Sequence, residues 1–321
     1  MAKLSSLLDF YYESMYADLK ILENGRLAII AKLKKTIFIL FMLGLCLCFF
    51  LIQSKFLIPL YAFILSSMLC FLVYMFIYRN ETAGYKSLFK DQIIEKIIHF
   101  LDPSLVYQKN HSILESEYQQ SEIFGQDYDR LSGNDLVSGT IEGVGIRFSD
   151  LHVEGKEFDK EGKEHWQTLF QGLFFIADFN KDFKSKTFIF PDFAQRSLGV
   201  LGEWIQGLNH SKGDLVKLDN SEFEKEFVVY GNDQIESRYI LSPALMERIL
   251  RFKQKNGAYI SLSFVYSKMY LCVHFNKKPF EPILTNSLLE FSEIKSYFEI
   301  LDMMVGIVRE FKLNEKIWSK R

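Results

Sequence analysis

Two uncharged apolar runs near the start of the chain limit what it can fold into. Thr36–Ile52 and Phe56–Tyr78 contain no Asp, Glu, Lys or Arg, and only Gln53, Ser54 and Lys55 separate them. At about 1.5 Å rise per residue, the second run spans roughly 34 Å as a helix, enough to cross a hydrocarbon core of about 30 Å. The first run spans roughly 25 Å, and flanking lysines that reach toward the headgroups extend it.

These runs could form a transmembrane hairpin, a buried hairpin of a soluble protein, or a cleaved export signal. Core helices of soluble proteins usually carry a polar stripe, and these runs carry none. A signal peptide is disfavoured because the first run follows a long charged segment and no small-residue cleavage site comes after it. Pro59 lies in the first turn of the second run, where proline is tolerated. The sequence therefore predicts a transmembrane helical hairpin.

Basic residues gather on the outer flanks of the predicted hairpin, while the connection between the two runs carries only Lys55. Positive charge is enriched on the cytoplasmic side of membrane proteins, so both termini are predicted to be cytoplasmic. The flanking residues are Lys20, Arg26, Lys32, Lys34 and Lys35 before the hairpin, and Arg79, Lys86, Lys90 and Lys96 after it.

Composition excludes some classes of protein. Lys and Arg (38) nearly balance Asp and Glu (40), so the chain has no overall field that would attract nucleic acid. Cys46, Cys48 and Cys70 lie in the apolar runs and predict small packed side chains rather than a metal site. Cys272 is alone in the remainder, which fits a reducing compartment.

The predicted organisation has four parts. Residues 1–35 form a cytoplasmic amphipathic helix, 36–78 the transmembrane hairpin, 79–125 a helical stalk, and 126–321 a cytoplasmic α+β domain. The first helix suits packing on the soluble domain, or contact with the membrane surface or a second copy. Its apolar residues recur at helical spacing and are Leu4, Leu7, Leu8, Tyr11, Met15, Leu19 and Leu22.

Beyond residue 138 the pattern alternates and is rich in glycine and β-branched residues, as in strands. Strands outnumber helices and are not interleaved with them, so a mainly antiparallel sheet with flanking amphipathic helices is predicted, giving the α+β class. Strands are expected within Ser138–Gly155, Trp166–Asn180, Thr187–Asp192, Phe223–Asp233 and, as a hairpin about Tyr266–Lys268, Tyr259–Phe275. Helices are expected at Ser112–Phe124, at Pro243–Asn256 between an N-cap Ser242 and Gly257, and at Ile294–Phe311, with a long connection at Ala194–Asp214.

Several patterns resemble sites without meeting the requirements of one. Gly139, Gly143 and Gly145 match neither nucleotide-binding glycine motif and precede a strand, so a β-turn is predicted. His152 and His165 flank one predicted turn and could hold a metal with Glu154 or Glu164, but exposed edge histidines are favoured. Cys272 and His274 share a face of one strand, yet a Cys/His pair needs activation and a third group.

Three polar or aromatic segments also have ordinary structural roles as alternatives to a site. Gly125–Asp135 carries three aspartates but lacks the Gly and Glu positions of a calcium-binding loop, so a solvated loop is predicted. LFFIADF and FIFPDF fit core strands, or alternatively the lining of an acyl-chain pocket. An ion-pair network at turns is expected for Arg147, Asp150, Asp233, Glu236 and Arg238. No catalytic residue set, cofactor or metal site is predicted.

Three long segments and one short one resemble an uncharacterised bacterial inner-membrane family, domain of unknown function thirty-one thirty-seven. They are IEGVGIRFSDLHVE, WQTLFQGLFFIADFNKDFKSKTFIFPD, FEKEFVVYGNDQIESRYILSPALMERIL and FEPIL. The resemblance implies a two-span membrane protein with a cytoplasmic β-rich domain, no assigned reaction, and a LemA-type helical membrane protein as a candidate partner. It directs attention to Arg147, Phe148, Ser149, Phe170, Gly172, Phe179, Lys181, Pro191 and Asp192.

Together these observations favour a membrane-anchored, cytoplasm-facing scaffold or binding protein over an enzyme. The lipid bilayer and another membrane or cytoplasmic protein are the expected partners, and nucleic acid is not. The alternative is a membrane-tethered enzyme or lipid-handling protein with a pocket in the β-rich domain, assembled from residues distant in sequence.

Overall fold

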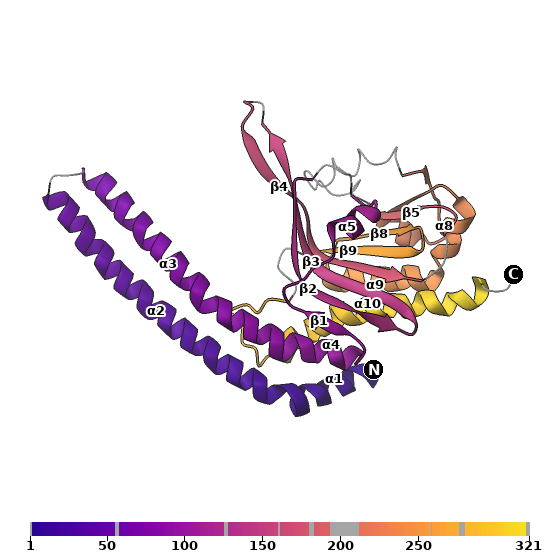
Figure 1. Cartoon of the computed structure of the whole chain (residues 1–321), viewed down its shortest axis with the longest axis horizontal. Coiled ribbons are helices and arrows are strands. Elements are labelled where there is room, and N and C mark those ends of the chain that lie inside the picture. The colour runs from indigo at the N-terminus through magenta and orange to yellow at the C-terminus, as the bar shows by residue number, and fades with distance from the viewer. Residues whose placement is uncertain are drawn as a thin grey trace. The chain divides into compact units, whose positions relative to one another are not determined.

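Figure 1 shows the computed structural model of the chain, which separates into two compact units. We call residues 1–96 with 281–296 the hairpin unit, and residues 97–280 with 297–321 the sheet unit, and describe each by itself. The described residues are 2–54, 58–124, 128–159, 161–179, 183–192, 212–257, 259–275 and 280–318.

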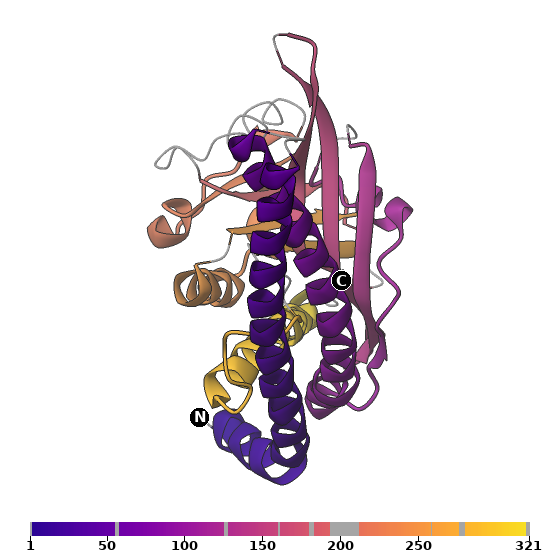
Figure 2. The same cartoon turned by 90° about the vertical axis from the view of Figure 1, so that its left-hand side faces the viewer.

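Two long helices run side by side through the hairpin unit (Figures 1 and 2). The segment expected to form a separate amphipathic helix is continuous with the first apolar run. The second helix begins at Pro59, the position expected for that proline. The first helix comprises α1 (Ala2–Phe10), the π-helical turn η1 (Tyr11–Met15) and α2 (Tyr16–Gln53). The second comprises α3 (Pro59–Phe89), the π-helical turn η2 (Lys90–Ile94) and α4 (Glu95–Leu101).

The described part of the chain contains two helices, Ser6–Gln53 and Pro59–Leu101, that are long and apolar enough to cross a membrane. In the most apolar 18-residue window of the first helix no residue is buried. In the corresponding window of the second helix 11% of the residues are buried. A soluble core helix of this composition would bury most of these side chains. Large apolar side chains such as Phe38, Phe49 and Phe76 instead point outward, each about two-thirds exposed.

The π-helical turns explain an unusual spacing of buried residues. Four-residue steps drift by about 40° each on an α-helix, so three steps would rotate a side chain roughly 120° off its face. A π turn contains more residues per turn, so it compensates for this rotation. Two groups of residues spaced by four therefore each stay on one buried face of their helix. The groups are Leu7, Tyr11, Met15 and Leu19 on the first helix, and Tyr85, Phe89, Ile93 and Ile97 on the second.

The described strands of the sheet unit form one nine-stranded sheet in the order β1-β2-β3-β4-β9-β8-β5-β7-β6, and each pairing is antiparallel. The α+β class and the mainly antiparallel sheet are therefore confirmed. The strands are β1 (Val106–Gln108), β2 (Arg130–Ile141), β3 (Val144–Phe158), β4 (Glu164–Asp178), β5 (Thr187–Pro191), β6 (Asp214–Leu215), β7 (Phe227–Gly231), β8 (Tyr259–Val265) and β9 (Lys268–His274).

Local turn chemistry explains the hairpins. Glu142 (φ 51°) and Gly143 (φ 86°) both have positive φ in the two-residue connection between β2 and β3, as a type I′ turn requires. The β-turn predicted for this glycine segment is therefore confirmed. The β8–β9 hairpin also turns at the predicted place, with Val265 paired to Lys268. The predicted connection at Ala194–Asp214 lies mostly outside the described residues.

Both faces of the sheet carry buried apolar side chains, as expected for a sheet that is covered on both sides. One face packs Phe170, Phe174 and Cys272 against Tyr118 of α5 (Glu115–Gln120). The other face buries alternate residues such as Phe175 and Leu271. Figures 1 and 2 place α9 (Pro243–Asn256) and α10 (Phe291–Trp318) on the opposite side of the sheet from α5.

The helices of the sheet unit agree only partly with expectation. α9 is capped as predicted, since the Ser242 side chain accepts from the amide of Leu245 and Gly257 ends the helix with φ 60°. α5 is much shorter than the expected Ser112–Phe124. The segment expected to be a strand from Phe223 begins inside α7 (Ser221–Glu224), and α8 (Gln234–Ile240) was not predicted. In both cases an Asn220 or Asp233 side chain caps a short helix.

Candidate functional site: the hairpin base

The hairpin unit contains a buried ion pair on α2, between η1 and the first apolar run. Glu23 and Arg26 are each 7% exposed, and the guanidinium donates two hydrogen bonds to the carboxylate, at 2.9 and 2.6 Å. The hydrogen bonds from Arg26 hold the pKa of Glu23 below its ordinary value. A charge pair this deeply buried requires further hydrogen bonds to offset its desolvation.

Those further hydrogen bonds come from residues 281–290, which we call the strap. Arg26 Nη1 donates to the carbonyl of Leu284 at 2.6 Å. Glu23 accepts from the hydroxyl of Ser287 at 3.1 Å and from the amide of Leu288 at 3.0 Å. The helix pair and the strap thus share one polar cluster.

Contacts on either side hold the strap in place. Tyr11, in η1, donates its hydroxyl proton to the carbonyl of Leu289 at 3.0 Å and packs edge-on against Phe291, with ring centroids 5.3 Å apart. Lys86 pairs with Glu281 at 2.6 Å. We call the ion pair, the two π-helical turns and the strap the hairpin base.

Tyr85 lies on α3, in the turns that precede η2, and is 5% exposed. Burial raises the pKa of its hydroxyl, which has no hydrogen-bond partner among the described residues. Buried polar groups without partners and π-helical turns are both uncommon and recur at functional sites. The contacts that the described residues make here are hydrogen bonds and ion pairs that hold the strap against the two helices.

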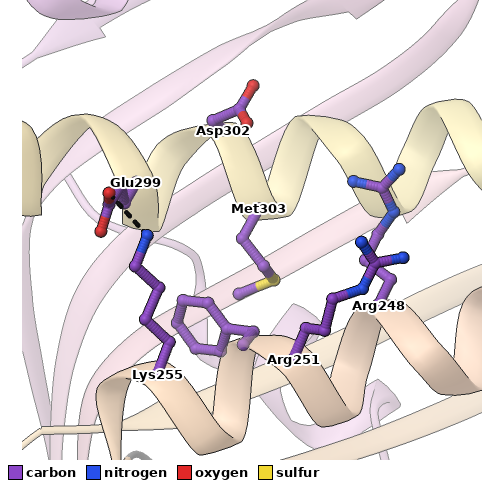
Figure 3. A pocket seen from close by; sticks show the side chains of 7 residues that line it. Arg248, Arg251, Lys255, Glu299, Asp302 and Met303 are labelled. Carbon is purple, nitrogen blue, oxygen red and sulfur yellow. Dashed lines mark hydrogen bonds and ion pairs between the residues drawn. The ribbon is translucent and has the colours of Figure 1, made fainter. Parts of the chain in front are cut away.

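A second candidate is a groove of about 330 Å³ between α9 and α10 in the sheet unit. Phe252 and Met303 are its apolar lining residues, and Figure 3 shows the Met303 side chain pointing from α10 toward α9. Arg248, Arg251 and Lys255 line the α9 side. The guanidinium of Arg248 fits against α10 because residue 306 is glycine, where a Cβ would lie 2.2 Å from Arg248 Nη1.

Two of these basic side chains form ion pairs with carboxylates. Lys255 pairs with Glu299 on α10 at 2.7 Å, drawn as the dashed line in Figure 3, and Arg251 pairs with Glu247 at 3.0 Å. Asp302 also lines the groove but points away from the arginines in Figure 3. Both signs of charge line the groove, so its charge does not select an anionic or a cationic ligand.

The histidines expected at one turn lie apart. On the β3–β4 pair, His152 is opposite Gln171 and His165 is opposite Glu157. Five positions of β3 therefore separate them, roughly 16 Å at the usual rise of a strand. His165 bonds Asp159 at 2.9 Å and His152 bonds Thr168 at 3.2 Å. Among the described residues, no group of three or more His, Cys, Asp or Glu is placed to hold a metal.

Cys272 and His274 share one face of β9, as the alternation predicts. Cys272 is fully buried, which raises the pKa of its thiol well above the ordinary value. His274 packs edge-on against Phe170, with ring centroids 4.8 Å apart, and burial lowers its pKa to about 4. Both shifts favour the neutral forms, whereas a reactive Cys/His pair requires the thiolate.

Acidification is expected to destabilise the sheet unit through His274. Its folded pKa of about 4 lies below the ordinary 6.5, so between these values the unfolded chain binds a proton that the folded chain does not. The free energy of unfolding should therefore fall by up to roughly 1.4 kcal/mol per pH unit as the pH drops through this window. Urea unfolding at several pH values measures this slope.

In the same experiment, His274→Gln should flatten the slope, because the group that takes up the proton on unfolding is then absent. An NMR titration that places the midpoint of His274 near 6.5 would contradict the burial argument.

Two other expectations were wrong. Within the acidic segment, residues 130–135 belong to β2 instead of a solvated loop, and Asp135 is 2% exposed and accepts a hydrogen bond from Tyr107. The expected ion-pair network is dispersed, because four of its five members make separate contacts with other residues. Arg147 pairs with Glu117, Asp233 caps α8, Glu236 accepts from the amides of Lys184 and Ser185, and Arg238 donates to the carbonyl of Lys217.

The aromatic segments proposed as a pocket lining belong to the core. Phe174 and Phe175 are fully buried on opposite faces of β4, and Phe188 and Phe190 stack on β5. The residues marked by the family resemblance are also mostly structural: Phe148, Phe170 and Phe179 are buried, Ser149 accepts from the amide of Ile113, Gly172 allows a close strand approach, and Pro191 and Asp192 lie at and after the end of β5. Lys181 lies outside the described residues.

Sequence reasoning missed the hairpin base. The sequence indicated Arg26 only as a basic residue that flanks the predicted hairpin, and it gave no reason to single out Glu23. Their three-residue spacing is compatible with an ordinary surface ion pair. The repeated four-residue spacing of Leu7, Tyr11, Met15 and Leu19 was the available signal, because it does not fit an ideal α-helix.

Comparisons with known proteins add a family and a weak structural similarity. The crystal structure of the mycobacterial trehalose monomycolate transport factor A, TtfA, matches with a TM-score of 0.32 and 8% sequence identity, over 64% of this chain and 87% of that chain. Similarity at this level establishes neither a common fold nor a common function. No curated protein matches the chain. Residues 168–313 match the family described as protein of unknown function (DUF3137), which is the family that the sequence resembles.

Proposed function

We propose that this chain is a two-span protein of a bacterial inner membrane, with both termini in the cytoplasm and the sheet unit acting there as a scaffold or binding platform. The observation that carries the proposal is the exposed apolar surface of α2 and α3. Exposing so many large apolar side chains to water would be very unfavourable, whereas lipid tails solvate them well.

Charge supports the orientation. Lys32, Lys34 and Lys35 precede the first apolar run and Arg79 follows the second, so four basic residues lie at the end of the hairpin away from its loop. Lys32 and Glu81 pair at 2.7 Å at this same end. The positive-inside rule places this end in the cytoplasm.

A scaffold or binding role is favoured over catalysis by the chemistry of the described residues. Cys272 is buried as a neutral thiol, His152 and His165 lie apart, and the groove between α9 and α10 is lined by ion pairs. The proposed partner is another membrane or cytoplasmic protein. A LemA-type helical membrane protein is the first to test, because the family resemblance suggested it.

A reporter that is active only outside the cytoplasm is expected to be silent when fused after Arg321, and active when inserted between Gln53 and Lys55. Alkaline phosphatase activity in intact cells, normalised to the amount of fusion protein, measures this difference. Activity of the fusion after Arg321 would overturn the proposed orientation, and silence of both fusions would overturn the two-span arrangement.

Co-purification from detergent tests the role of the sheet unit. Mass spectrometry of the solubilised chain should identify one stoichiometric protein partner and no enriched lipid. A specific lipid or small molecule carried through purification would contradict the scaffold proposal and support the lipid-handling alternative.

A further inference from the structure

The first helix binds the strap largely through main-chain atoms of the strap. Arg26 binds the carbonyl of Leu284, Glu23 binds the amide of Leu288, and the Tyr11 hydroxyl binds the carbonyl of Leu289. These contacts fix the path of the strap backbone. They join residues 258 to 278 positions apart in the chain.

The hydrogen bonds between the strap and the Glu23–Arg26 pair are expected to form and break together. Glu23 and Arg26 are buried with the strap in place, and each uses hydrogen-bonding capacity on it. If the strap left, the buried charges and the polar groups of the strap would lose partners together, and water would have to replace them. Removing partners from buried charges is costly, so a partly detached strap is disfavoured.

The strap leads directly into α10. That helix begins at Phe291, whose ring packs on Tyr11, and it continues without interruption beyond residue 296 into the sheet unit. The backbone hydrogen bonds of a helix make its successive turns move together. The position of the strap therefore constrains the first turn of α10.

We propose that the strap is a conformational link through which the tilt of the two apolar helices controls the order of the start of α10. This rests on the proposed membrane insertion of α2 and α3. A helix longer or shorter than the local bilayer adapts by tilting. Tilting moves Glu23 and Arg26, which lie on the same continuous helix as the first apolar run, and so changes how often the strap contact is made.

Hydrogen–deuterium exchange of the full chain in lipid nanodiscs tests this link. We compare phosphatidylcholine with short (myristoyl) and long (oleoyl) chains and follow the peptide covering residues 281–296. In the wild-type chain its exchange rate should differ between the two bilayers by at least about fivefold, the lower end of typical coupling between sites. In Glu23→Gln the strap should exchange rapidly in both bilayers, and the difference should disappear.

Two further variants separate the link from a loss of stability. Glu81→Gln removes the exposed pair with Lys32 in the same unit and should behave as wild type. Ser287→Ala removes one hydrogen bond to Glu23 and should change strap exchange in the same direction as Glu23→Gln, by a smaller factor.

Equal strap exchange of the wild-type chain in both bilayers would overturn the proposal, as would equally faster exchange of β8 and β9 in the Glu23 variant. Failure of the protein to enter nanodiscs at all would count instead against the membrane insertion, which the reporter fusions test independently.

Discussion

Gly172→Ala is expected to destabilise the sheet unit by at least about 3 kcal/mol, because the position combines strained backbone with a steric conflict. Gly172 has φ 150°, and a Cβ there would lie 2.0 Å from the carbonyl oxygen of Val273 on the neighbouring strand. That oxygen belongs to the backbone of β9 and cannot rotate away as a side chain would. Relief would require β4 and β9 to separate where they pair. Thermal unfolding followed by near-ultraviolet circular dichroism measures the loss.

Gly145→Ala is the matched control. Gly145 lies on β3 of the same sheet, and a Cβ there would meet nothing nearer than Asp178 Cβ, at 4.0 Å. Its substitution should change the free energy of unfolding by less than about 1 kcal/mol. If the two variants were equally stable, the close approach of β4 and β9 would not be a constraint on the fold.

Arg26→Met is expected to cost about 3–5 kcal/mol in the hairpin unit, since it leaves the carboxylate of Glu23 buried without its counter-charge. The remaining hydrogen bonds from Ser287 and Leu288 are too few to stabilise the ion alone. Lys32→Met, which breaks the exposed pair with Glu81, should cost no more than about 1 kcal/mol. Thermal unfolding in one detergent compares the two.

Combining Arg26→Met with Glu23→Gln should recover part of the lost stability, because no unpaired charge then remains buried. The recovery should be incomplete, since the carbonyl of Leu284 still loses its donor. A double variant less stable than Arg26→Met would show that Glu23 remains favourable without Arg26, against the argument from desolvation.

Local signals in the sequence were sufficient where a few neighbouring residues decide the conformation. Ser242 and Gly257 marked the ends of α9 because capping involves only the adjacent turn. Gly143 indicated a β-turn because glycine readily adopts the positive φ that a tight hairpin turn requires, which depends on the turn itself. The short helix α8 was missed, although Asp233 offered a cap, because a strand-like run precedes it directly.

A single sequence did not predict which strands, distant in the chain, pair with each other. The residues around Gly172 indicated a strand, but only the placement of β9 beside β4 shows why glycine is needed there. Asp135 was expected in a loop, but the pairing of β1 with β2 brings Tyr107 to it as a hydrogen-bond donor. In both cases the deciding neighbour is distant in sequence or depends on strand register, which alternation alone does not specify.

The sequence by itself therefore determined the two helices able to span a membrane, because the transfer of a segment into lipid depends on the sum of its own residues. It also determined the α+β class and the hairpins that rest on local turn chemistry. Tertiary structure alone decided that Glu23 and Arg26 are buried, since their partners Leu284 and Leu288 lie more than 250 residues away. An ion pair on a helix becomes a costly and specific contact only when another segment excludes water from it. The residue pattern of the helix does not show which segment does so.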